Sequence, residues 1–221
     1  MKPEDPSFQS FISDLLTKSD LSRSKRIFAW LSASVALYDH RMTRFFIELA
    51  FENQQPVLKV KEVILQSHLF CGFPNAIEGL IVLNRVLHDR GLSDDNFVES
   101  RDEKEVIQDG LDLCQRIYGK NYDKLIKNME HISSDISKWM VADGYGKVLS
   151  RPILTPAERE LSVIAALAVL ERERQLVSHI RGAVHVGASY DEIFQVISGL
   201  TILIPEECVQ SAFDILKKAL P

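Results

Sequence analysis

Apolar residues recur at helical spacing along most of this 221-residue chain, and no run of alternating polar and apolar residues is long enough to form a sheet. The sequence therefore predicts an all-α fold. In the first two thirds of the chain the expected helices cover about 8–17, 22–37, 41–53, 57–70, 74–89, 103–118 and 121–142. Gly91, Gly119 and Gly144 stand where three of these helices should end, as is typical of helix stops.

The C-terminal third carries the sharpest helix signals. Thr155, followed by Pro156 and Glu158, has the order of an N-cap, a first-turn proline and a capping box. Ser189 and Glu192 repeat the capping box one helix later. The remaining signals are an extended segment over 147–154, a helix end at Gly187 and a helix start at Pro205.

The two ends of the chain resemble each other at an offset of 130 to 133 residues. The matching pairs are Leu37 with Leu170, Glu62 with Glu192, and Pro74 with Pro205. The sequence therefore predicts two tandem repeats, a pseudo-two-fold pair and not a solenoid, which usually needs at least three units. The expected division is 1–92 for the N-terminal repeat, 93–104 for a linker and 105–221 for the C-terminal repeat.

Composition excludes several classes of protein. A net charge of −5 and a pI near 5.7 argue against general binding to nucleic acid or to an anionic membrane, because both need a basic surface. No apolar window approaches the roughly 20 residues of a spanning helix, and the N-terminus does not look like a signal peptide. Three distant cysteines, Cys71, Cys114 and Cys208, have no metal-binding spacing and fit a reducing compartment. We expect a soluble cytoplasmic protein.

Glu160 and His179 are the candidate chemical groups. Each is expected on the apolar side of its helix, and a carboxylate and an imidazole on neighbouring helices can transfer protons. Two simpler interpretations stay open. Glu160 lies in the first turns of its helix, where the helix dipole favours a solvated carboxylate. His179 can equally be a hydrogen-bonded core residue, and a structural role is equally open for His68.

Three segments resemble the carboxymuconolactone decarboxylase family, which also contains the alkylhydroperoxidase D proteins. They are Arg151–Arg159 (RPILTPAER), His179–Gly187 (HIRGAVHVG) and Asp191–Ile193 (DEI). The resemblance covers about 105–221 and, more loosely, 20–90, where Phe70–Pro74 (FCGFP) is similar to a Tyr-x-Gly-x-Pro stretch of the family. It implies the helical fold of alkylhydroperoxidase D and assembly into a homo-oligomer.

The resemblance to the decarboxylase branch also implies chemistry. It implies loss of carbon dioxide from a small carboxylated lactone, with no metal and no organic cofactor. His179 would be the acid/base and Glu160 its partner, while Arg151 or Arg159 would bind the substrate carboxylate and His68 would reach a shared pocket. We expect a cavity beside the Glu160–His179 pair, partly closed by the first repeat or by another subunit.

Two alternatives remain. A peroxidase of the alkylhydroperoxidase type is disfavoured because Arg172 and Gln175 occupy the positions of its redox CxxC, and neither can form a disulfide. A non-enzymatic scaffold is the second, because Ile27 and Phe46 stand in the first repeat where Glu160 and His179 stand in the second.

Overall fold

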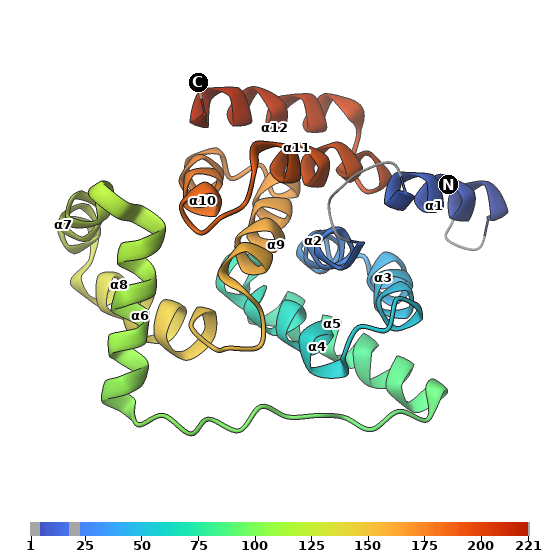
Figure 1. The fold of residues 1–221 in the computed structure, drawn as a ribbon, viewed down its shortest axis with the longest axis horizontal. Coiled ribbons are helices and arrows are strands. Elements are labelled where there is room, and N and C mark those ends of the chain that lie inside the picture. Colours follow the sequence, from blue (N-terminus) through green and yellow to red (C-terminus); the bar gives the residue numbers. More distant parts are fainter. Residues whose placement is uncertain (1–4, 18–22, 221) are drawn as a thin grey trace.

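The computed structural model describes residues 5–17 and 23–220, and all regular secondary structure in these ranges is helical (Figure 1). The expected all-α fold is confirmed. The helices are α1 (Pro6–Thr17), α2 (Arg23–Ala36), α3 (His40–Glu52), α4 (Val57–Gln66), α5 (His68–Arg90), α6 (Glu103–Tyr118), α7 (Tyr122–Ile132), α8 (Ser134–Trp139), α9 (Pro156–Val169), α10 (Glu173–His185), α11 (Tyr190–Ser198) and α12 (Glu206–Ala219). A π-helix, η2 (Met140–Leu149), follows α8, and the short 3-10 turns η1 (Gly119–Asn121) and η3 (Gly199–Ile202) follow α6 and α11. Residue 22, where the second helix was expected to begin, lies outside the described residues.

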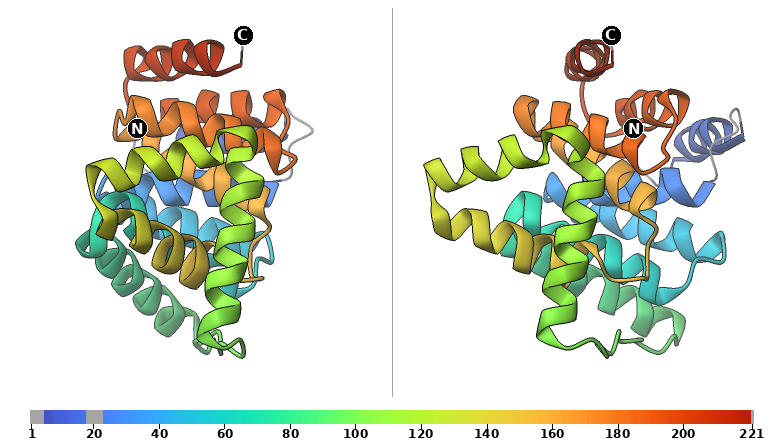
Figure 2. Two further views of the ribbon diagram at one scale, coloured as in Figure 1. Left: turned by 90° about the vertical axis from the view of Figure 1, so that its left-hand side faces the viewer. Right: turned by 60° about the vertical axis from the view of Figure 1, so that its left-hand side comes forward.

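Helices α2 and α9 pack against each other in the centre of the molecule (Figure 1). Both are buried over almost their whole length. Helix α3 packs on α2 and α10 packs on α9, while α12 lies outermost beyond α10 and α11 (Figure 2). The largest core side chain, Trp30 of α2, lies so close to Gly199 that a Cβ there would come within 2.2 Å of the indole ring. A glycine is therefore needed at that position.

Helices α6 to α8 and η2 form a second group at one side, joined to α5 by an extended segment over 92–102 (Figure 1). A small core of its own, centred on Cys114, Ile117 and Tyr145, holds this group together. Helix α6 also packs on α10. The second group therefore reaches the C-terminal helices at the end of α6.

The chain between 121 and 154 differs from the prediction. The single helix expected over 121–142 is interrupted at Ser133, whose extended backbone and hydroxyl cap the start of α8. The extended segment expected from Lys147 is also wrong, because η2 continues to Leu149. Gly146 serves packing here, since a Cβ at this position would lie 2.7 Å from the Val106 carbonyl oxygen.

The break between α4 and α5 is earlier than expected. Helix α4 ends at Gln66, and α5 starts at His68 and contains a kink at Gly72, which has φ of +83°. That backbone conformation favours glycine, and Pro74 follows in the next turn, where its ring prevents an uninterrupted helix.

The two ends of the chain show corresponding contacts. Lys25 Nζ of α2 pairs with Glu192 of α11 at 2.6 Å, and Lys59 Nζ of α4 pairs with Glu158 of α9 at 2.9 Å. An offset of 133 residues relates Lys25 to Glu158 and Lys59 to Glu192. The same cross-brace therefore occurs twice, with the two charges exchanged.

Candidate active site

Glu160 on α9 and His179 on α10 are in direct contact. The distance from Glu160 Oε2 to His179 Nδ1 is 2.8 Å, and the two residues are 1% and 6% exposed. Helix α9 exposes almost none of its surface, so the carboxylate is buried in its second turn and is not solvated there. A buried carboxylate normally needs a hydrogen-bonded partner, and His179 provides it.

The surroundings of the pair fix the orientation of the imidazole. The ring of Phe70 packs edge-on against His179, with centroids 5.3 Å apart. Gly182 allows close packing, because a Cβ there would lie 3.2 Å from Glu160 Oε2 and 2.6 Å from Ile117. With Nδ1 held by the carboxylate, Nε2 has no hydrogen-bond partner within the described ranges. Nε2 is therefore the ring nitrogen that can exchange a proton with a ligand.

Two tyrosines of the second helical group lie on the Glu160 side. Tyr145 of η2 donates a hydrogen bond to the Tyr118 hydroxyl of α6 at 3.2 Å. Burial raises the pKa of both phenols, and the negative charge of Glu160 raises it further. Burial, assisted by Glu160, also raises the pKa of the Cys114 thiol to about 12. All three groups are neutral at physiological pH.

Sequence patterns did not single out these tyrosines. Tyr145 lies between Gly144 and Gly146, where helix breakers predicted an end, and Tyr118 precedes another glycine. Only the packing of α6 on η2 and α10 brings them to Glu160.

The guanidinium of Arg159 is buried and binds other parts of the protein. It is 1% exposed and donates from Nη2 to Glu62 at 2.7 Å and from Nη1 to Gln66 at 2.9 Å. Nη2 also donates to the Arg151 carbonyl at 2.8 Å. Both terminal nitrogens are thus occupied by α4 and by the chain before α9, so the guanidinium links the two ends of the chain and is not free for a substrate carboxylate.

Arg151 and His68 lie away from the pair. Arg151 contacts Glu62 at 3.2 Å and stacks on Phe97, with 4.4 Å from the guanidinium carbon to the ring centroid. His68 Nδ1 contacts the Leu65 carbonyl at 2.6 Å, and its ring stacks on Phe73. No hydrogen bond or ion pair in the described part of the chain joins either residue to Glu160 or His179.

The structure also differs from the prediction of a cavity beside the Glu160–His179 pair. Three surface cavities stand out among residues 5–17 and 23–220, and none is lined by Glu160 or His179. The Phe70 ring lies against His179, and Ile117 lies close to Gly182, which is next to Glu160. In the same ranges no group of three or more His, Cys, Asp or Glu side chains has the arrangement of a metal site.

Residues 137–217 match the model of the carboxymuconolactone decarboxylase family. This part of the chain is therefore similar to the carboxymuconolactone decarboxylases. The matched segment begins at the end of α8 and contains η2, Glu160 and His179, and most of α12. It includes only part of the second helical group, because α6 and α7 precede it.

Two individual proteins are similar to this chain over a longer stretch than the family model covers, and a third over less than half of the chain. A protein of Schizosaccharomyces pombe named peroxisomal protein 2 is 27% identical over 72% of this chain and 75% of its own length. A Saccharomyces cerevisiae protein of the same name is also 27% identical, over 72% of this chain but only 64% of its own length. A 4-carboxymuconolactone decarboxylase of Acinetobacter baylyi is 28% identical over 43% of this chain and 72% of its length.

These names correct the expected cytoplasmic location. Two relatives that align with most of the chain are named as peroxisomal proteins, so the prediction based on composition alone is wrong. Net charge and unpaired cysteines indicate a reducing compartment, but they do not distinguish one such compartment from another. Among the described residues, no helix has the length and apolar character required to cross a membrane.

Proposed function

We propose that this protein is a cofactor-independent carboxy-lyase that removes carbon dioxide from a small carboxylated lactone. The observation that supports it most directly is the buried contact between Glu160 and His179, which leaves one imidazole nitrogen unpaired. The family match and the similarity to a 4-carboxymuconolactone decarboxylase support the same reaction class.

In the proposed reaction the bond from the ring carbon to the carboxylate breaks, and its electron pair moves into the conjugated lactone to give a dienolate. His179 then delivers the proton on Nε2 to carbon, and solvent returns a proton to the imidazole. Glu160 accepts the hydrogen bond from Nδ1–H and stabilises the imidazolium that exists before the transfer. We expect ligand access to Nε2 past Phe70.

We propose Tyr118 as the hydrogen-bond donor to the developing oxyanion. Its hydroxyl accepts the hydrogen bond of Tyr145, and its own proton has no acceptor within the described ranges. Two phenols in series polarise each other, so the outer one becomes a stronger donor. Because both remain protonated at neutral pH, Tyr118 can stabilise a dienolate oxygen.

The proposal includes the tandem repeat, with an N-terminal half that is structural. Ile27 and Phe46, at the positions of Glu160 and His179, are fully buried core residues. The exchanged lysine–glutamate braces described above are expected of two fused copies of one unit.

Exposed apolar side chains on α7 and α8, such as Ile132 and Trp139, fit assembly into a homo-oligomer. By similarity to the yeast relatives, we place the protein in the peroxisome.

The test is turnover of carboxymuconolactone by the full chain, followed by ultraviolet absorbance as the conjugated system changes. We expect a rate proportional to protein concentration, with no requirement for an added metal or cofactor. A rate equal to that of the buffer would contradict this substrate. Release of carbon dioxide from other carboxylated lactones would then separate a different substrate of the same class from a non-enzymatic scaffold.

The reactivity of the cysteine thiols distinguishes the proposed carboxy-lyase from a thiol peroxidase. Burial raises the pKa of Cys71 to about 11 and, with Glu160, that of Cys114 to about 12. Since the pKa of an unperturbed thiol is about 9.0, the thiolate fraction of Cys71 falls about 100-fold at pH 8. We expect both thiols to react with iodoacetamide at least about 100-fold more slowly in the native protein than in urea. Fast labelling of either in the native state would contradict this expectation.

A further inference from the structure

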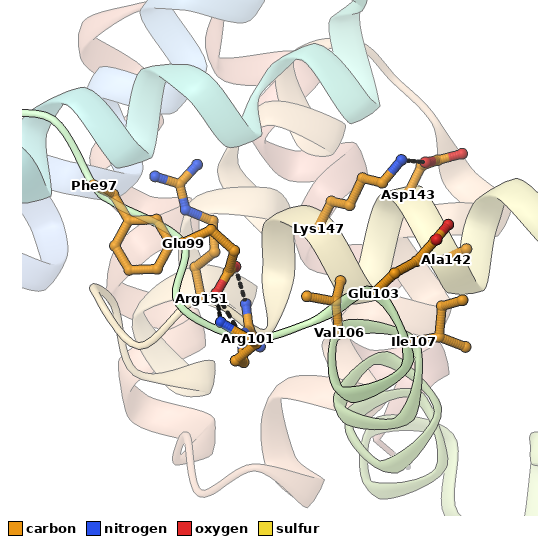
Figure 3. A pocket seen from close by; sticks show the side chains of 10 residues that line it. All are labelled: Phe97, Glu99, Arg101, Glu103, Val106, Ile107, Ala142, Asp143, Lys147 and Arg151. Atoms are coloured by element: carbon orange, nitrogen blue, oxygen red, sulfur yellow. Dashed lines mark hydrogen bonds and ion pairs between the residues drawn. The ribbon is translucent and has the colours of Figure 1, made fainter.

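A cavity of about 710 Å³ lies between the extended segment over 92–102, the start of α6 and η2 (Figure 3). Figure 3 shows Phe97 and Arg151 together at one end and Lys147 with Asp143 at the other. Phe97, Arg101, Val106, Ala142, Lys147 and Arg151 are among the residues that line it.

This cavity is separate from the Glu160–His179 pair. Helix α6 lines it near Val106 and meets the pair near Ile117, and eleven residues of α-helix span about 16 Å. Between these points Gly110 packs directly on η2, where a Cβ would lie 2.6 Å from the Gly146 nitrogen. Backbone contact thus closes the interface between the two places.

Arg151 is the cation that a ligand can use. Arg101 is held by Glu99 and Asp109, and Lys147 by Asp143. Arg151 instead shares the single carboxylate of Glu62 with Arg159.

Two guanidiniums on one buried carboxylate leave a surplus of one positive charge at the cavity wall. The Arg151 side chain is 14% exposed, and its Nε is buried without a partner in the described part of the chain. Stacking on Phe97 holds the guanidinium plane in place, so that it is preorganised for a planar anion.

The remaining walls restrict the class of ligand. Val106, Ile107 and Ala142 give an apolar surface for a hydrocarbon ring. Of the three carboxylates in the lining, Glu99 and Asp143 neutralise Arg101 and Lys147, while Glu103 adds a negative charge that disfavours a phosphate or any other polyanion. We infer that this cavity is a second binding site, which takes a small planar monocarboxylate with its carboxylate on Arg151 and its ring against the apolar wall. This inference does not rest on the proposed decarboxylation.

The experiment is a calorimetric titration of the full chain with benzoate, using benzamide as the neutral probe of the same shape. We expect saturable binding of benzoate and none of benzamide. Arg151→Gln should weaken benzoate binding at least about 10-fold, because it removes a charge-assisted bidentate contact. Ala142→Phe should weaken it comparably by filling the cavity while Arg151 and its partners remain.

Two control variants complete the design. Arg41→Gln removes an exposed arginine of α3 and should leave binding unchanged. His179→Ala should also bind benzoate like the wild-type protein. The inference is overturned if benzoate does not bind, if both Arg151→Gln and Ala142→Phe bind it normally, or if a His179→Ala protein shown to be folded does not bind it, since the ligand would then sit at the Glu160–His179 pair.

Discussion

Replacing His179 with alanine is expected to lower kcat for carboxymuconolactone by about 10²- to 10⁴-fold, the usual contribution of a general acid. The imidazole is the group whose free Nε2 would deliver the proton, and no other titratable side chain in the described ranges forms a hydrogen bond with Glu160. The substitution also leaves the buried carboxylate without its partner. Turnover must therefore be compared with the melting temperature measured on the same sample.

Two further variants separate catalysis from stability. Glu160→Gln retains an oxygen that accepts from His179 Nδ1–H but loses the charge that stabilises the imidazolium, so it should lower kcat more than it raises KM. His88→Ala is the matched control, because His88 is 91% exposed on α5 and far from the pair in sequence. Full activity of a folded His179→Ala protein would refute the role that we assign to this histidine.

Replacing Arg159 with leucine is expected to destabilise the protein by about 3–5 kcal/mol, the cost of removing one partner of a buried ion pair. The Glu62 carboxylate would keep only Arg151, at 3.2 Å. Gln66 Oε1 and the Arg151 carbonyl would each lose the donor that Arg159 provides. Urea unfolding monitored by circular dichroism measures the loss as a lower midpoint at an unchanged slope.

A double substitution tests the reason for that loss. Arg159→Leu combined with Glu62→Leu removes both charges, and it should recover much of the stability because no buried carboxylate is left with an incomplete set of partners. Arg174→Leu is the control, since Arg174 is exposed near the start of α10 and should change the free energy of unfolding by less than about 0.5 kcal/mol. A single Arg159→Leu variant as stable as the wild type would show that this cluster does not hold the two ends of the chain together.

Local rules made much of the fold predictable. Thr155 and Ser189 both form the capping boxes that their spacing to Glu158 and Glu192 indicates. Helix α9 is buried on all sides, as its nearly continuous apolar run predicts. Glu160 and His179, expected on the apolar sides of neighbouring helices, are in direct contact.

Arg159 shows where local rules end. From the sequence it is an arginine in the first turns of a helix, available to a substrate. Its three acceptors come from α4, nearly 100 residues earlier, and from the backbone before α9. The pairing of Tyr118 with Tyr145 and the cavity beside Arg151 likewise depend on how α6 lies against η2.

The sequence by itself determined the helical class, most helix starts, the family resemblance and the two residues that form the central pair, because these follow from hydrophobic period, caps and motif spacing within one or two helices. The tertiary structure alone decided which arginine is buried, which phenols lie within the electrostatic influence of Glu160, and that Arg151 lines a cavity that His179 does not. The physical reason is that burial and ion pairing depend on contacts between distant segments, and the cost of desolvating each charge is set only when those segments pack.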